Sequence, residues 1–416
     1  MAHDTDTDIG QVPRSYPFSR YRLEPDPQYA ELRGSEPVCR VQLPYGPPAW
    51  LVTGYHLTKD VLGDARFSRA AAVGRDNPRE SAVDISQVAE SVLSMDPPEH
   101  TRIRKLVGKA FTPRGVEGLR PRAAEIAVGL LDDMMAGGPP ADLVGSFSFA
   151  LPAVMICELL GIPEGDRQTF RGWADTVVST TTATPVQQQG AYLHLISYIA
   201  GLVAQRRAHP GNDMLTGLVQ ARDNDDCLSE SELLVLAMTL LVAGYETTAH
   251  QITNMTYTLL TRPSQLQQLR EQPELLPAAV EEMLRFNVFG SAINPRIATT
   301  DVELGEVLVR AGDPVLCSRS SANRDENVFS HADELDFSRD TNPHVAFGYG
   351  PHFCLGANLA RMELQVALGA ILSRLPGVRI AVPEDSLTWH NGDHNARPCS
   401  IFRSPGDALS YIPSQD

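Results

Sequence analysis

The spacing of apolar residues divides the chain into a long helical region and two short β-rich regions. From about residue 101 to residue 284 the pattern is mainly helical. Two β-type runs, at 38–43 and 49–53, flank the turn-like sequence PYGPP and predict a hairpin. A second β-rich patch covers 301–318. Because strands and helices are segregated rather than alternating, we expect a mainly α fold with a smaller β-rich region and no βαβ units.

One predicted helix is unusually long. It opens at a capping box formed by Ser229 and Glu232 and stops before Pro263. About 33 residues at 1.5 Å each give roughly 50 Å, enough to cross a domain. Since its middle is nearly all apolar, the helix should be buried. Within this buried stretch lies AGYETT, residues 243–248, which places a glycine, a carboxylate and two threonines where a helix core normally has none.

The AGYETT segment has two readings. In the structural reading, Thr247 or Thr248 bonds to a backbone carbonyl one turn earlier and Glu246 reaches the surface. In the functional reading, the helix is locally distorted beside a bound small molecule, and the hydroxyl and carboxylate relay protons. The segment alone does not decide between them.

Composition and charge narrow the range of partners and locations. The chain has 416 residues and a formal net charge of −16, which argues against a nucleic-acid or anionic-membrane partner. Its six cysteines are scattered, which favours a reducing compartment. The polar N-terminus has no apolar signal core, so we expect a cytoplasmic protein with no membrane association, a disordered segment at 1–15 and a single domain at 16–416.

A second motif, FGYGPHFCLG at 347–356, surrounds one cysteine with glycines, aromatics and a histidine. Cys354 precedes a strong helical run, and backbone N–H groups at a helix N-terminus favour a thiolate. A zinc site with His344 and His352 lacks the usual paired spacing, and a nucleophilic cysteine would leave the glycines and aromatics without a role. A thiolate ligand to a flat macrocyclic metal cofactor uses every feature.

A third motif, EEMLR, places Glu282 and Arg285 on one face of a predicted helix. Alone it carries little weight, because such pairs usually lie on solvated faces.

These three motifs, in this order and spacing, resemble the cytochrome P450 family, and the resemblance extends from about Tyr16 to Ile401. FGYGPHFCLG is similar to that family's heme-binding loop, AGYETT to the acid–alcohol motif of its central helix, and EEMLR to its Glu-x-x-Arg motif. The loop residues that fall on the family pattern are Phe347, Gly350, His352, Cys354 and Gly356.

The resemblance implies a single-domain cytochrome P450 fold that holds heme b between the central helix and the helix after Cys354. Cys354 would be the thiolate ligand of the iron. Glu246 and Thr247 would deliver protons during activation of the co-substrate O2, for which Ala243 and Gly244 would leave room. The residues that match the family's contacts to the heme propionates are His100, Arg104, Arg296 and His352. Glu282 and Arg285 would be structural and would pin the segment 322–329.

The resemblance also implies that electrons come from NAD(P)H through a separate flavoprotein reductase and a small acidic ferredoxin. Arg102, Lys105 and Lys109 lie near Arg104 and predict a local basic patch that could steer such a partner, although ordinary solvated side chains would look the same. We expect the enzyme to be a monomer.

The expected substrate is a small molecule, a natural-product scaffold of polyketide, macrolide or peptide origin, hydroxylated or epoxidised in antibiotic biosynthesis. By resemblance, an apolar pocket with a few polar groups would receive it. The expected pocket residues are Met238, Val242, Ala243, Phe289, Ala292, Ile293, Asn294 and Asn395.

Several alternatives to an electron-fed monooxygenase stay open. Oxidative C–C or C–N coupling could use the same heme chemistry. A peroxide-driven enzyme would not need Glu246 and Thr247. A non-catalytic member that docks to a carrier protein could dispense with Cys354, and a heme sensor would be expected to carry a regulatory module.

Overall fold

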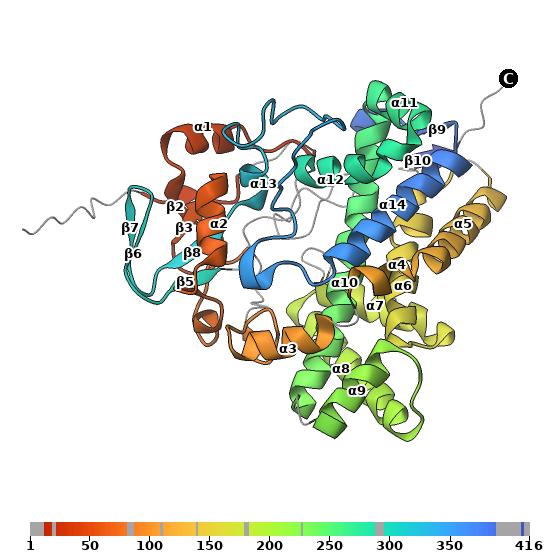
Figure 1. Ribbon diagram of the computed structural model, residues 1–416, viewed down its shortest axis with the longest axis horizontal. Coiled ribbons are helices and arrows are strands. Elements are labelled where there is room, and N and C mark those ends of the chain that lie inside the picture. Colours follow the sequence, from red (N-terminus) through yellow and green to blue (C-terminus); the bar gives the residue numbers. More distant parts are fainter. Residues whose placement is uncertain are drawn as a thin grey trace, which may run out of the picture.

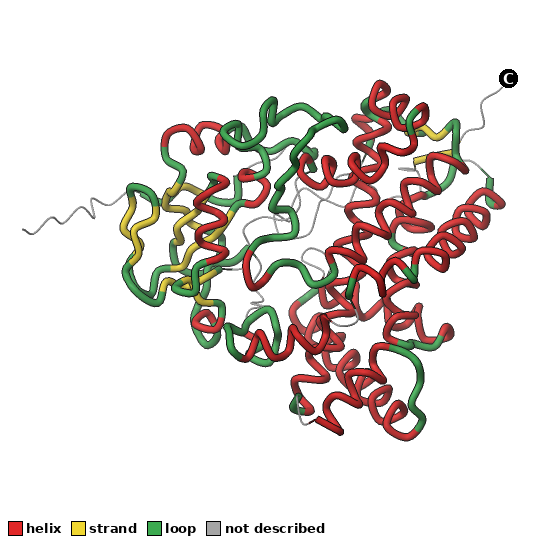
Figure 2. Tube along the Cα trace, viewed as in Figure 1, coloured by secondary structure: helices red, strands yellow, loops and turns green. Residues whose placement is uncertain are grey.

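The computed structural model describes residues 12–18, 22–80, 87–108, 111–138, 140–178, 183–225, 228–287, 295–387 and 409–411. Within these ranges most helices gather on one side of the molecule and most strands on the other, although a few short helices lie beside the large sheet (Figure 2). The predicted mainly α architecture with a smaller β-rich region is therefore confirmed. Most of the segment 1–15 lies outside the described residues, but Arg14–Ser15 forms the first short strand.

The helices make up most of the molecule (Figure 1). They are α1 (Gln28–Ser35), α2 (Tyr55–Gly63), α3 (Glu99–Gly108), α4 (Pro113–Glu117), α5 (Arg120–Ala136), α6 (Ala150–Leu160), α7 (Arg167–Val178), α8 (Pro185–Ala208), α9 (Met214–Asp225), α10 (Glu230–Leu260), α11 (Pro263–Glu271), α12 (Leu276–Phe286), α13 (Arg319–Ala322) and α14 (Ala357–Arg374).

The strands form one six-stranded sheet and two small two-stranded sheets. They are β1 (Arg14–Ser15), β2 (Val38–Gln42), β3 (Ala49–Val52), β4 (Phe67–Ser68), β5 (Arg296–Ala298), β6 (Val302–Leu304), β7 (Val307–Val309), β8 (Pro314–Cys317), β9 (Val378–Ile380) and β10 (Leu409–Tyr411). The large sheet has the order β1-β2-β3-β8-β5-β4. The predicted hairpin is confirmed as the antiparallel pair β2–β3, and β3 then pairs in parallel with β8.

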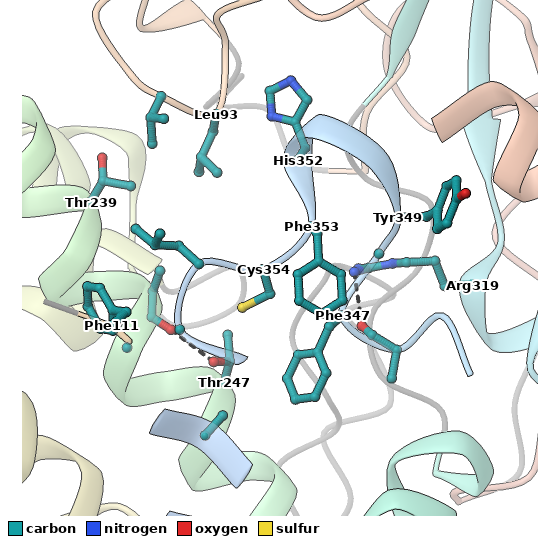
Figure 3. Close-up of a pocket in the computed structure, with 18 of the residues that line it drawn as sticks. Leu93, Phe111, Thr239, Thr247, Arg319, Phe347, Tyr349, His352, Phe353 and Cys354 are labelled. Carbon is teal, nitrogen blue, oxygen red and sulfur yellow. Dashed lines mark hydrogen bonds between the residues drawn. The ribbon is translucent and has the colours of Figure 1, made fainter. Parts of the chain in front are cut away.

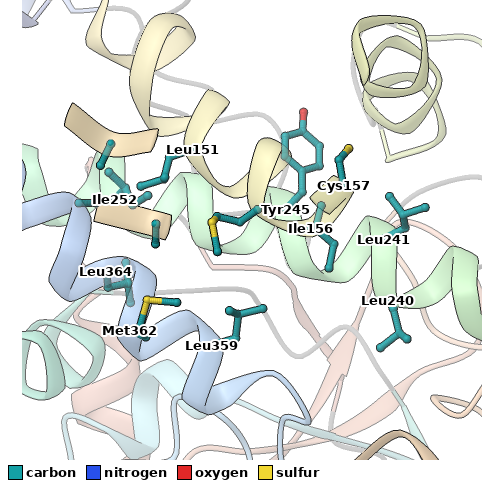
Figure 4. Close-up of a cluster of buried hydrophobic side chains, with 14 of the residues drawn as sticks. Leu151, Ile156, Cys157, Leu240, Leu241, Tyr245, Ile252, Leu359, Met362 and Leu364 are labelled. Atoms are coloured by element: carbon teal, nitrogen blue, oxygen red, sulfur yellow. The ribbon is translucent and has the colours of Figure 1, made fainter. Parts of the chain in front are cut away.

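The long helix α10 is the central element of the helical side. Its predicted start is confirmed: the backbone N–H of Glu232 donates to Ser229 Oγ at 3.1 Å, and Ser229 N–H donates to Glu232 Oε2 at 2.7 Å. Its apolar side chains pack between α6 and α14 (Figure 4). By length and composition α10 could cross a membrane, but most of its apolar stretch is buried inside the protein, as in the core helix of a globular domain.

Candidate active site

A cavity of about 360 Å³ lies where α10, α3, the ends of several strands and the loop 346–356 meet. Cys354 borders it from the loop and Thr247 borders it from α10 (Figure 3). The first two sequence motifs, more than 100 residues apart, therefore face one space.

The cysteine loop is shaped by glycines in the left-handed region. Gly348 has φ 77° and Gly350 has φ 70°. A Cβ on Gly350 would lie 2.5 Å from the backbone oxygen of Leu62, so no other residue fits there without moving the backbone. The loop closes through a hydrogen bond from Cys354 N–H to Phe347 O at 2.8 Å, and α14 begins three residues after the cysteine.

Cys354 opens onto the cavity, and its thiol is subject to opposing influences. Burial raises the pKa of the Cys354 thiol, and this outweighs the Gly356 N–H and the charges of Arg319 and Arg104, which lower it. A raised pKa disfavours the nucleophilic-cysteine alternative. The zinc alternative also lacks support, because no group of three His, Cys, Asp or Glu side chains in the described ranges could hold a metal ion.

The AGYETT segment stays α-helical throughout, so the predicted distortion of α10 is absent. Thr247 donates its hydroxyl hydrogen to Ala243 O at 2.9 Å, as the structural reading expected, and it also borders the cavity. Helix packing explains the glycine at position 244, because a Cβ there would lie only 2.9 Å from Ile156 Cδ1 of α6. Glu246 is half-buried and does not line the cavity.

Tyr245 ties the same turn of α10 to α7. Its ring is fully buried, and its hydroxyl donates a hydrogen bond to the Asp175 carboxylate. The motif therefore contacts the cavity through Thr247 and α7 through Tyr245.

The predicted propionate contacts come together at one edge of the cavity. The rings of His100 and His352 lie with centroids 4.3 Å apart, and each has a buried Nε2 without a partner in the described structure. Burial, then repulsion from nearby arginines, lowers the pKa of His352 to about 2. Arg104 donates to Phe353 O, and Arg296 donates to Phe67 O at 3.2 Å. Burial lowers the pKa of both guanidinium groups.

These groups fit heme as the group that would occupy the cavity. The two histidine nitrogens, which have no partner among the described residues, the half-buried Arg104 and the buried Arg296 would all be satisfied by anionic acceptors, which two carboxylates would provide. Gly356 has an ordinary φ, and a Cβ there would meet nothing within 4 Å, so protein packing does not require glycine at this position. A flat group lying against the backbone here would account for a glycine at this position.

Two cavity arginines were missed from the sequence. Arg69 and Arg319 both line the cavity. Arg69 donates to Leu93 O from Nε at 2.8 Å and from Nη2 at 2.6 Å, and Arg319 donates to Ala346 O at 3.3 Å. Neither belongs to a motif; only the strand register relates them to Arg296.

The predicted substrate pocket needs one correction. Ala243 lines the cavity, but Met238 and Val242 do not; Thr239 and Leu240, next to them on α10, do. The residues of α10 that line the cavity recur every three or four positions, as expected for one face of a helix. This face is offset by about one residue from the face that the sequence analysis predicted. Five of the predicted pocket residues lie outside the described ranges: Phe289, Ala292, Ile293, Asn294 and Asn395.

Glu282 and Arg285 form a buried structural network rather than a solvated pair. Arg285 Nη2 and Glu282 Oε1 lie 2.7 Å apart, and both side chains are at most 1% exposed. Arg285 also donates to the backbone oxygens of Asn323, Ala332 and Glu334. Arg285 thus fixes the predicted segment 322–329 through Asn323, and it also fixes the chain beyond that segment through Ala332 and Glu334.

The predicted basic patch is smaller than expected. Arg102 pairs with Glu232 at the start of α10, and Arg104 is turned inward to Phe353. Lys105 is exposed on α3, while Lys109 lies outside the described residues.

Comparisons with known proteins agree with this site. Residues 203–376 match the family model described as Cytochrome P450. The chain is 50% identical over 382 residues to mycinamicin IV hydroxylase/epoxidase of Micromonospora griseorubida, covering 91% of this chain and 96% of that protein. It is 49% identical to nocardicin C N-oxygenase of Nocardia uniformis subsp. tsuyamanensis, covering 94% and 97%. A solved structure described as cytochrome P450mel 107F1 with biaryl coupling reactivity superposes with a TM-score of 0.88 at 44% identity, covering 94% and 99%.

Proposed function

This chain belongs to the cytochrome P450 family, and we propose that it hydroxylates or epoxidises a natural-product scaffold in antibiotic biosynthesis. This proposal rests mainly on the alignment of almost the whole chain, at about 50% sequence identity, with the hydroxylase/epoxidase and the N-oxygenase named above. The site supports the same chemistry, because Cys354 and Thr247 face one cavity from opposite elements. In this proposal residues 16–416 form one heme-thiolate domain that acts as a cytoplasmic monomer.

The residues around the cavity would divide the work of holding the cofactor. Cys354 would be the iron ligand, and the groups that would hold the two carboxylates include His100, Arg104, Arg296 and His352. Phe347, Gly350 and Gly356 would frame the ring. Heme, once bound, supplies an iron centre that binds and activates O2.

Thr247 would position water and a proton for this chemistry. Because its hydrogen is donated to Ala243 O, the hydroxyl presents only acceptor lone pairs to the cavity. It can therefore hold a water that points a hydrogen toward it. Glu246, the preceding residue, is half-buried outside the cavity lining, so it would pass protons between solvent and that water through further water rather than by direct contact. The bond to Ala243 O and the catalytic role are thus compatible.

Electrons would come from NAD(P)H through a ferredoxin reductase and a ferredoxin. Lys105 is an exposed cation on α3, the helix whose Arg104 contacts the cysteine loop. An acidic partner docked there would lie on the side of the cavity that carries Cys354.

Optical titration of the ferric holoprotein tests the substrate class. Mycinamicin IV, nocardicin C, other macrolides and cyclic peptides would be added in turn, and a change of the iron spin state would identify a ligand that displaces water. Turnover of that ligand with ferredoxin and reductase should add one oxygen atom, detected by mass spectrometry. A product with a new C–C or C–N bond and no added oxygen would favour oxidative coupling. Activity with H2O2 in the absence of ferredoxin and reductase would favour a peroxide-driven enzyme.

A pair of cysteine variants tests the heme-thiolate assignment. Cys354→Ala should abolish the thiolate-type spectrum of the ferrous CO complex. Cys317→Ala is the matched control, because Cys317 also lines the cavity but lies in β8. A thiolate-type spectrum that survives in Cys354→Ala would overturn the assignment, and full biological function without Cys354 would favour a non-catalytic role.

A further inference from the structure

The cavity extends along α10 beyond Thr247 to a buried glutamine. Gln251 lines the cavity one turn after Thr247, and the residue is only 5% exposed. Its Oε1 atom is enclosed and has no hydrogen-bond partner within the described ranges. A buried amide without a partner is costly, so this side chain points to a molecule that the protein itself does not supply.

The neighbouring helices line this part of the cavity with apolar side chains. These are Leu284 of α12 and Leu359, Ala360 and Leu364 of α14. Heme would add mainly hydrocarbon here, because its two carboxylates are expected at the edge that carries the histidines and arginines described above. Water and a bound substrate are therefore the partners left for the Gln251 amide.

Polar groups that lack a partner continue past the cavity. Asn254 follows Gln251 by three residues on α10 and is fully buried, and both ends of its amide are without a partner in the described structure. Glu363 of α14, which packs against α10, is also buried, and burial raises its pKa, which favours the neutral acid. Buried groups of this kind are usually satisfied by ordered water. Water is thus the expected occupant of this face of α10.

Gln251 and Thr247 complement each other in hydrogen bonding. Thr247 gives its own hydrogen to Ala243 O, so toward the cavity it can only accept, whereas an amide can donate. Side chains four residues apart on a helix begin about 5–6 Å from each other, and one water bonded to both groups spans roughly 5 Å. A single water can therefore bridge the two side chains.

We propose that Gln251 donates a hydrogen bond to the cavity water that Thr247 holds, and thereby fixes the orientation of this water. One hydrogen of the water points to Thr247 and one of its lone pairs accepts from the amide, so its second hydrogen has a defined direction. Without the amide the water can rotate about its bond to Thr247. Gln251 is thus a positioning residue, and its role rests on the water-positioning function proposed for Thr247.

Oxidation of the reduced holoprotein by O2 tests this role without substrate or ferredoxin. Dithionite-reduced holoprotein would be mixed with O2 in a stopped-flow spectrometer, and the return of the ferric spectrum followed as the iron gives one electron to O2, which leaves as superoxide. Gln251→Met keeps the size but cannot donate. It should react about threefold faster or more, because no oriented hydrogen then stabilises the charge that O2 acquires before it leaves.

Gln267→Met is the matched control. Gln267 lies on the exposed surface of α11 and donates to Glu271 at 2.7 Å, so this variant should react at the rate of the parent protein.

Gln251→Glu separates the donor from the shape of the side chain. The neutral acid carries an O–H donor, whereas the carboxylate can only accept. Relative to the parent protein at the same pH, the variant should react at the parent rate at low pH. It should approach the rate of Gln251→Met as the pH rises through the carboxyl pKa, which burial raises above its ordinary range.

Urea unfolding of the apoprotein separates positioning from a structural role. Gln251→Met removes no protein hydrogen bond of Oε1, so the unfolding midpoint should stay unchanged or rise. A lower midpoint together with an unchanged oxidation rate would show a structural role and overturn the proposal. If Gln251→Met yields no holoprotein, the pH dependence of Gln251→Glu decides.

The proposal also fails if Gln251→Met is oxidised at the parent rate, or if Gln251→Glu follows Gln251→Met at every pH. No natural product takes part in these measurements. Failure to find an oxidised substrate therefore leaves this test intact, and failure here leaves the proposed substrate class untouched.

Discussion

Thr247 and Thr239 lie on the same face of α10, and both donate a hydroxyl hydrogen to a carbonyl one turn earlier, Thr247 to Ala243 O and Thr239 to Val235 O. Both also border the cavity. Eight residues separate them, about 12 Å along the helix. Local bonding therefore cannot distinguish a proton-positioning threonine from a structural one, but position along the helix can.

Thr247→Ala should keep heme but waste reducing equivalents. Without the hydroxyl, water at this point of the cavity is not held, so most electrons should leave as peroxide and product per NAD(P)H should fall about tenfold or more. Peroxide and product would be measured together. Thr239→Ala is the control and should stay coupled; full coupling in Thr247→Ala would remove the proton-positioning role.

Two glycines of the cysteine loop should respond differently to alanine. Gly350→Ala combines a left-handed φ of 70° with a Cβ 2.5 Å from Leu62 O, so the apoprotein should lose about 2 kcal/mol or more of stability. Gly356→Ala meets no protein atom, so the apoprotein should unfold within about 0.5 kcal/mol of the parent, while the holoprotein releases heme faster. Urea unfolding of apoprotein and heme transfer would check both. Equal effects of the two variants on the apoprotein would contradict this division.

At the scale of elements, the site residues that the sequence itself marked most clearly were those in local motifs, whereas His100, Arg104 and Arg296 were expected only from the family resemblance. FGYGPHFCLG, AGYETT and EEMLR each lie within one turn or one helix, so short spacing was enough to locate them. Arg69 was missed because its position near Arg296 depends on strand register across more than 200 residues. Arg319 follows Arg296 by only 23 residues, but it reaches the cavity through the pairing of β5 with β8, which no local motif marks. The cavity-facing side of α10 was misjudged for a related reason: nearly all its positions are apolar, so the pattern does not mark one face.

A charged network joins the cysteine loop to two helices. Glu281 of α12 accepts from Arg361 Nε of α14 at 2.7 Å and contacts His344 Nε2 at 3.0 Å, just before the loop. The Arg361 guanidinium also lies 4.5 Å from the Phe347 ring centre. Burial alone would raise the pKa of Glu281, but His344 and Arg361 outweigh it and lower the pKa to about 2.

This pKa predicts a specific acid sensitivity. Because the folded pKa lies below the ordinary value of 4.5, Glu281 stabilises the fold above about pH 4.5, and the contribution is lost as pH falls toward 2. Glu281→Gln should lower the free energy of unfolding by about 1–3 kcal/mol at pH 7 and flatten its decline below pH 4.5. Urea unfolding at several pH values, followed by circular dichroism, measures both.

Glu117→Gln is the control for that prediction. Glu117 also pairs with an arginine, Arg120, but on the exposed surface, so its loss should leave the free energy of unfolding nearly unchanged at any pH. An acid decline identical in Glu281→Gln and the parent protein would show that the network does not stabilise the loop.

At the scale of the molecule, a net charge of −16 coexists with a cationic cavity and few exposed lysines. Overall repulsion should slow an acidic electron donor, so any local cation near the cysteine loop should have a large effect on its approach. Of the predicted patch, Arg102 and Lys105 are exposed on α3, and Arg102 is paired with Glu232, whereas no ion pair of Lys105 is found among the described residues.

Lys105→Glu should slow reduction by ferredoxin roughly threefold to tenfold at low ionic strength, and the difference should shrink as salt screens the charge. Stopped-flow reduction at several salt concentrations measures it. Arg379→Glu introduces the same charge change on exposed β9, far from α3 in Figure 1, and should have little effect. If both variants slowed reduction by ferredoxin equally, the effect would come from the net charge of the protein and not from docking of ferredoxin at α3.

The pairing of β3 with β8 also sets the order in which the protein can mature. Trp50 pairs with Val315, so the β2–β3 hairpin leaves the ribosome long before its sheet partner exists. At about 5–20 residues per second, that interval lasts tens of seconds. During it one edge of the hairpin is unpaired and open to other chains. The edge of the sheet that borders the cavity forms only once β8 has been made, and Cys354 follows later still, so heme insertion must be among the last events of biogenesis.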